Sequence, residues 1–102
     1  MIQINFSATE ATGFNLKVTG HSGSGEKGRD IVCAAASSLI LTLVGGLEEE
    51  GAEVTGLLRE GDCDIRVSFR ESQSEALNAV ARVFRFGFRR LAETYPEFIE
   101  MN

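Results

Sequence analysis

The chain has 102 residues, 43% of them hydrophobic and 25% charged, which is the composition of a single globular domain spanning residues 1–102. Its 15 acidic and 10 basic side chains give a net charge of −5, so we expect no direct binding to nucleic acid phosphates. No segment reaches the ~20 apolar residues that span a bilayer, so we expect no membrane partner. The two cysteines fit neither a disulfide framework nor a metal cluster. We therefore expect a cytoplasmic protein without a metal or cofactor.

The N-terminal residues alternate between apolar and polar side chains, which is the pattern of a strand with one buried face. Residues 1–8 follow this pattern, and it resumes over residues 14–18 after a turn near Thr12 and Gly13. These two segments predict an antiparallel hairpin that ends at Gly20.

Residues 20–37 follow the hairpin and contain the only histidine, His21, and one of the two cysteines, Cys33. Asp30 is placed to cap the start of a helix. Cys33 then lies in the first helical turn, where unpaired N–H groups and the helix dipole favour a thiolate. A glycine-rich loop before Asp30 would let His21 reach that helix end and share a proton with the thiol. On spacing alone, a buried structural cysteine and a solvated histidine are the commoner interpretation.

The first helix is expected from Asp30 to about residue 47, and it is so apolar that it must be mostly buried. The apolar positions that support this expectation are Ile31, Ala35, Leu39 and Val44, with Ala34, Leu41 and Leu43 nearby. Two further strands are expected over residues 54–58 and 63–69, joined by a short turn at residues 60–62.

A second long helix is predicted from capping groups at residues 72–75 to about Tyr95, just before the only proline. Its apolar stripe is expected to contain Leu77, Ala81, Phe84, Phe88, Leu91 and Tyr95. Val83 and Phe86 fall away from that stripe, so one face of the helix is expected to meet another subunit. The order β-β-α-β-β-α predicts an α+β fold with two layers, a mostly antiparallel four-stranded sheet and two long helices.

The residues between the hairpin and the first helix also carry a family resemblance. Its motif reads Gly20-His21, then Gly25-Glu26, then Gly28-x-Asp30-Ile31-Val32-Cys33-Ala34-Ala35-Ala36-Ser37. This motif resembles the ribosomal-processing cysteine protease family of bacteria, whose members remove the N-terminal extension of ribosomal protein L-twenty-seven. The resemblance implies that Cys33 is the nucleophile and His21 the general base of a cysteine endopeptidase that supports ribosome assembly. It also implies a homodimer, and an extension peptide as the substrate, cut near hydrophobic residues.

Other residues of the motif are candidates for supporting or substrate-binding roles. Four glycines would let the loop fold over an extended peptide: Gly20, Gly23, Gly25 and Gly28. Ser37 lies one turn after Cys33, where its hydroxyl either lines the site or bonds to its own backbone. Asp30 caps the helix, orients His21, or does both. Backbone N–H groups around Val32 and Cys33 are candidates to hold the oxyanion of an acyl-transfer intermediate.

The sequence also offers two alternative ligands, a dinucleotide and RNA, and contains a second cysteine. Residues 23–28 match the dinucleotide pattern G-x-G-x-x-G, but the carboxylate of Asp30 would face the pyrophosphate and no parallel strand-helix-strand unit is expected. A row of arginines on the second helix gives RNA binding as a minor alternative: Arg82, Arg85, Arg89 and Arg90. Cys63, between two aspartates that raise a thiol pKa, is expected to be structural.

A different class of function keeps the fold without the chemistry. The protein would then be a non-catalytic dimeric module that binds a peptide or a ribosomal partner in the same groove. Turnover of a peptide distinguishes an enzyme from such a module.

Overall fold

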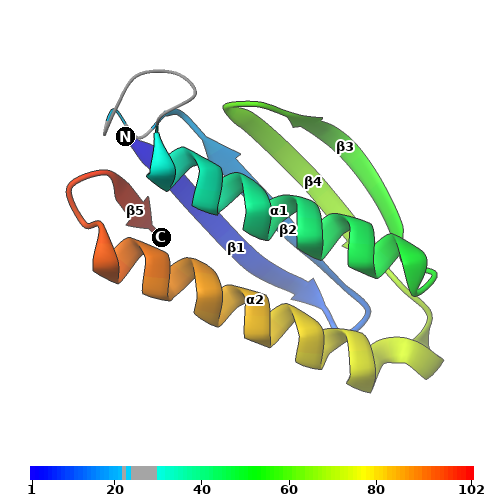
Figure 1. Ribbon diagram of the computed structural model, residues 1–102. Coiled ribbons are helices and arrows are strands. Elements are labelled where there is room, and N and C mark those ends of the chain that lie inside the picture. Colours follow the sequence, from blue (N-terminus) through cyan, green and yellow to red (C-terminus); the bar gives the residue numbers. More distant parts are fainter. Residues whose placement is uncertain (22, 24–29) are drawn as a thin grey trace.

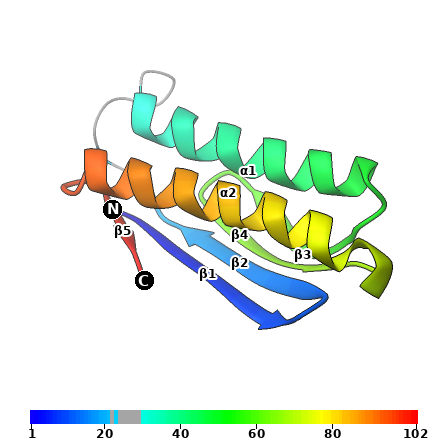
Figure 2. The same ribbon diagram turned by 90° about the horizontal axis from the view of Figure 1, so that it is seen from below.

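Two helices lie side by side on one face of a sheet (Figure 1), and the edge-on view shows these two layers (Figure 2). The computed structural model describes residues 1–21, 23 and 30–102. The strands are β1 (Ile2–Glu10), β2 (Gly13–Thr19), β3 (Glu53–Arg59), β4 (Asp62–Ser68) and β5 (Ile99–Met101), and the helices are α1 (Ile31–Glu49), the short η1 (Glu71–Gln73) and α2 (Ser74–Thr94). The predicted two-layer α+β fold is confirmed.

The sheet has the order β3-β4-β2-β1-β5 within the described part of the chain. The three pairs among its four long strands are antiparallel, as predicted, and β1 and β2 form the expected hairpin. The short β5, which was not predicted, adds a fifth strand parallel to β1, with Ile2 opposite Ile99. Three residues are too few for an alternating pattern to be recognised in the sequence.

The alternation of the strands determines which side chains enter the core. Ile4, Leu16 and Val67 are fully buried, whereas their neighbours Gln3 and Arg66 are exposed. Because side chains in a strand alternate between faces, one face of the sheet packs under the helices and the other remains in solvent.

The expectation that α1 is mostly buried is wrong, because six of its 19 residues are buried. Its buried residues are Val32, Ala36, Ile40, Leu43, Val44 and Leu47. Of the apolar positions expected to be buried, only Leu43 and Val44 are, and Ile31 is 67% exposed. By length and composition alone α1 is also apolar enough to cross a membrane, with a mean hydropathy of 1.9. This corrects the expectation that no segment of the chain is long and apolar enough to span a bilayer. Since α1 is apolar on several sides, the contacts with the sheet and α2 determine which side is buried.

The predicted stripe of α2 is confirmed. Leu77, Ala81 and Phe88 are buried, and the other three predicted residues pack against the core. Gln73, one of the predicted capping residues, accepts a 3.3 Å hydrogen bond from the Arg70 N–H in a capping box at η1, but it makes no side-chain capping bond to α2 itself. The Ser74 hydroxyl donates a hydrogen bond of 2.7 Å to the Ala11 carbonyl, which ties the helix to the turn between β1 and β2.

Candidate active site

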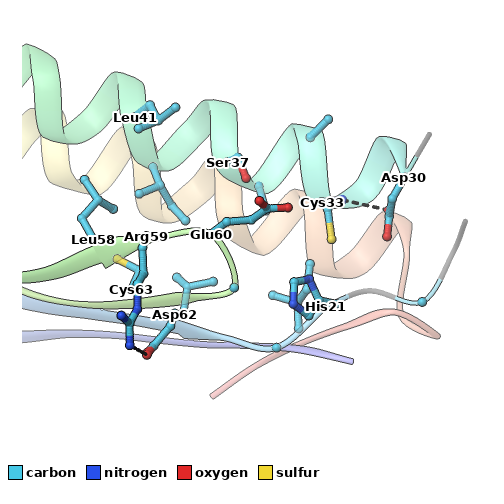
Figure 3. A pocket seen from close by; sticks show the side chains of 18 residues that line it. His21, Asp30, Cys33, Ser37, Leu41, Leu58, Arg59, Glu60, Asp62 and Cys63 are labelled. Carbon is cyan, nitrogen blue, oxygen red and sulfur yellow. Dashed lines mark hydrogen bonds and ion pairs between the residues drawn. The ribbon is translucent and has the colours of Figure 1, made fainter. Parts of the chain in front are cut away.

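A cavity of about 850 Å³ opens between the start of α1, the end of β2 and the turn between β3 and β4. His21, Cys33 and Ser37 all line it, and Figure 3 shows them with residues of the β3–β4 turn. The sheet register explains why these segments meet. Thr19, the last residue of β2, pairs with Asp62, the first residue of β4, so the chain leaving β2 passes beside the turn.

Cys33 is held at the beginning of α1 by the cap that the sequence predicts. Asp30 is the N-cap of α1, and its carboxylate accepts hydrogen bonds from the backbone N–H groups of Val32, at 3.1 Å, and Cys33, at 3.0 Å. Because these two N–H groups donate to the carboxylate, they are not available as oxyanion donors in this conformation. The Cys33 side chain is partly exposed to the cavity.

His21 lies two residues after the end of β2, and Gly20 stands between the strand and the histidine. Gly20 has φ +92°, and a Cβ atom there would collide with the backbone oxygen of Met1, so this position requires glycine. The Gly20 N–H donates a 3.0 Å hydrogen bond to the Gly61 carbonyl. In Figure 3 the imidazole of His21 and the sulfur of Cys33 point toward one another. The fold thus brings together two residues that are twelve positions apart in the sequence.

The remaining motif residues have different positions. Ser37 lies on the same side of α1 as Cys33 and lines the cavity. Gly23, with φ +74°, also lines the cavity, and a Cβ atom there would meet nothing described within 4 Å. Gly25 and Gly28 are outside the described residues.

The β3–β4 turn forms a wall of the site that sequence reasoning did not find. Leu58, Arg59, Glu60 and Gly61 all line the cavity, and Glu60 extends from the turn toward α1 in Figure 3. An ion pair of 3.6 Å joins Arg59 to Asp62 across the turn. The sequence predicted a turn here, but its proximity to His21 depends on pairing between strands more than 40 residues apart.

Cys63 differs from Cys33 in its surroundings. It is 2% exposed, and burial, followed by the charges of Asp64 and Asp62, raises its pKa from 9.0 to about 11. The thiol therefore stays protonated at neutral pH, which agrees with the structural role expected from the sequence. Among residues 1–21, 23 and 30–102, no three His, Cys, Asp or Glu side chains gather in a way that could hold a metal ion.

The fold and cavity define a small α+β protein that presents a thiol and an imidazole to one cleft, as thiol-dependent enzymes do. Comparison with protein families identifies the particular enzyme class. The model of the family described as cysteine protease Prp matches residues 1–100, so this chain belongs to that family and is a cysteine protease.

Solved structures share the fold over the whole chain. An essential ribosomal processing protease Prp from S. aureus, in complex with a covalently linked product peptide, has a TM-score of 0.78 at 20% identity, covering 100% of this chain and 98% of that chain. The same protease with a substrate peptide has a TM-score of 0.72 at 19% identity and the same coverage. SMU.848 from Streptococcus mutans has a TM-score of 0.74 at 31% identity, covering 100% of this chain and 92% of that chain. None of the curated proteins is significantly similar to this chain.

Proposed function

We propose that this protease removes the N-terminal extension of a large-subunit ribosomal protein of the L-twenty-seven type, and that it does so in the cytoplasm. The observation that carries the proposal is the position of Cys33 and His21 on one cavity, in a chain that belongs to the cysteine protease Prp family. The S. aureus Prp structures with substrate and product peptides support a peptide substrate. The net charge of −5 favours a basic substrate, as ribosomal proteins generally are.

In the proposed mechanism, Cys33 is the nucleophile and His21 is the general acid and base. The Cys33 thiolate attacks the peptide carbonyl carbon and forms a carbon–sulfur bond, and the His21 imidazolium gives its proton to the leaving amine as the carbon–nitrogen bond breaks. Water then attacks the thioester, with His21 taking one of its protons. The carbon–sulfur bond breaks, the acid product leaves, and the thiolate and imidazolium are restored.

The walls of the cavity support an apolar residue in the substrate. Ile40 and Leu41 of α1 face the cavity together with Leu58 of β3, and Leu41 and Leu58 are 61% and 40% exposed. An apolar substrate side chain that covers these residues would gain about 25 cal/mol for each Å² removed from water. This is the reason to expect cleavage beside a hydrophobic residue.

The homodimer is part of the same proposal. Val83 and Phe86 on α2 are 66% and 53% exposed, as the sequence pattern predicts, and exposed apolar side chains at successive turns of one helix favour an interface. Light scattering at micromolar concentration tests this part, and a mass of 11.1 kDa would contradict it.

The decisive experiment is cleavage of an extension peptide, followed by mass spectrometry, with the parent protein and three variants. We expect Cys33→Ala to abolish cleavage and His21→Ala to reduce it severely. Cys63→Ala changes the other cysteine and is the matched control, so it should retain cleavage. Parent-like cleavage by Cys33→Ala would refute the proposed mechanism, and peptide binding without turnover by the parent would favour the binding module.

A further inference from the structure

The β3–β4 turn contains Gly61, and the neighbours of this glycine restrict the residue at position 61 more than the turn conformation does. Gly61 has φ +76°, a left-handed conformation in which glycine is favoured and asparagine is tolerated. The ion pair across this turn joins exposed side chains and so contributes little to holding it. A turn alone would therefore accept either glycine or asparagine at position 61.

The His21 ring lies directly on Gly61. A Cβ atom at position 61 would be 2.8 Å from His21 Nε2 and 2.9 Å from His21 Cε1, closer than carbon atoms pack in proteins. Both atoms belong to one rigid ring, so the whole imidazole would have to move. The backbone before the ring is also fixed, because the Gly20 N–H donates to the Gly61 carbonyl at 3.0 Å.

Another glycine with positive φ shows that this contact is not general. Gly51, between α1 and β3, has φ +93°, and a Cβ atom there would meet the Gln73 Nε2 atom at 3.3 Å. That atom donates a hydrogen bond to the Glu50 carbonyl, and neither Gly51 nor Gln73 lines the cavity. Gly51 and Gly61 thus share the backbone requirement, but only Gly61 contacts the proposed general base.

We propose that Gly61 is a positioning residue: the absence of a side chain at this position lets the imidazole of His21 pack against the turn and face Cys33. The proposal rests on the catalytic role of His21 in the proposed function. It assigns the β3–β4 turn, 40 residues away in the sequence from His21, the task of fixing the general base.

The contact can be observed first in the parent protein by NMR. His21 is the only histidine, so its ring protons are unambiguous. Nuclear Overhauser effects between these protons and the Gly61 Hα protons are expected. Their absence would overturn the proposal, whatever the variants do.

Substitutions then separate ring displacement from backbone strain. Gly61→Ala and Gly61→Asn both introduce a Cβ atom, while asparagine tolerates the positive φ, and Gly51→Ala introduces comparable strain far from the site. We expect both Gly61 variants to move the His21 Cε1–H resonance and to lower kcat/KM by about 100-fold, mainly through kcat, as for a misplaced catalytic group. The pH dependence of Cys33 alkylation should shift toward that of His21→Ala. Gly51→Ala should leave all three readouts unchanged.

Two results identify which idea has failed. A folded Gly61→Asn variant with a parent-like His21 resonance and parent-like kcat would overturn the positioning role, even where His21→Ala is inactive. Parent-like cleavage by His21→Ala would instead refute the proposed function.

Discussion

The cap formed by Asp30 affects both the stability of α1 and the position of Cys33. Its carboxylate accepts the N–H groups of Val32 and Cys33 at 3.1 and 3.0 Å. Asp30→Ala removes both hydrogen bonds and leaves the first turn of the helix without its cap. We therefore expect this variant to be less stable and to hold Cys33 less firmly.

The size of the effect follows from the two contributions that Asp30 makes. Loss of a capping side chain costs about 1 kcal/mol, and loss of a negative charge at a helix start costs a further ~0.3–1 kcal/mol. A loss of about 1–2 kcal/mol lowers Tm by roughly 4–16 °C in a domain of this size. Asp30→Asn retains the capping oxygen and loses only the charge, so its Tm should fall by about half as much or less.

Circular dichroism at 222 nm follows unfolding of the three proteins, and peptide cleavage well below every Tm follows the site. The expected order in both assays is parent, then Asp30→Asn, then Asp30→Ala. Equal loss of cleavage in both variants, with a stable Asp30→Asn protein, would refute the reasoning, because the charge rather than the cap would then be required.

Three further substitutions test other parts of the structure. Folding keeps the Cys63 thiol protonated up to a pKa of about 11 instead of 9.0, so its contribution is complete below pH 9 and is lost as pH rises toward 11. This loss is at most about 3 kcal/mol, and Cys63→Ala should flatten the alkaline decline in urea unfolding; an unchanged decline would contradict this. Phe88 is fully buried beside Phe6, so Phe88→Ala should cost about 3–5 kcal/mol in the same assay, and a loss below about 1 kcal/mol would show that the core closes around it. Gly45 lies within α1, and a Cβ atom there would meet no atom outside the helix backbone within 4 Å, so Gly45→Ala should add about 1 kcal/mol of stability, whereas a lower Tm would contradict the open space at this position.

The sequence predicts the sheet better than the packing of the helices, for a physical reason. Alternation in a strand identifies one buried face, and the fully buried Ile4, Leu16 and Val67 occupy the predicted face. In α1 apolar residues surround the helix, so several stripes compete and periodicity cannot choose among them. In α2 the charged positions separate one main apolar stripe from the rest of the helix, and the prediction of that stripe was correct.

The two halves of the candidate site differ in the same way. Asp30, Cys33 and Ser37 lie on one helix, so helical spacing places them together from the sequence alone. The approach of His21 to Cys33 was a hypothesis that glycine flexibility allowed and that the family resemblance made specific. No local pattern could place His21 against the β3–β4 turn, because that contact requires β2 and β4 to pair with Thr19 opposite Asp62.

Gly61 shows what a local interpretation leaves out. A glycine between Glu60 and Asp62 is sufficiently explained by a tight turn, since its φ of +76° is one that glycine adopts without strain. That explanation permits asparagine as well. A Cβ atom at position 61 would lie 2.8 Å from the His21 imidazole, so with the ring in this position neither asparagine nor alanine fits. The same residue therefore satisfies a backbone requirement, which the sequence reveals, and a side-chain requirement, which arises only when the end of β2 is placed beside the turn. Substitutions that meet the first requirement and violate the second are consequently the ones that separate folding from catalysis in this protein.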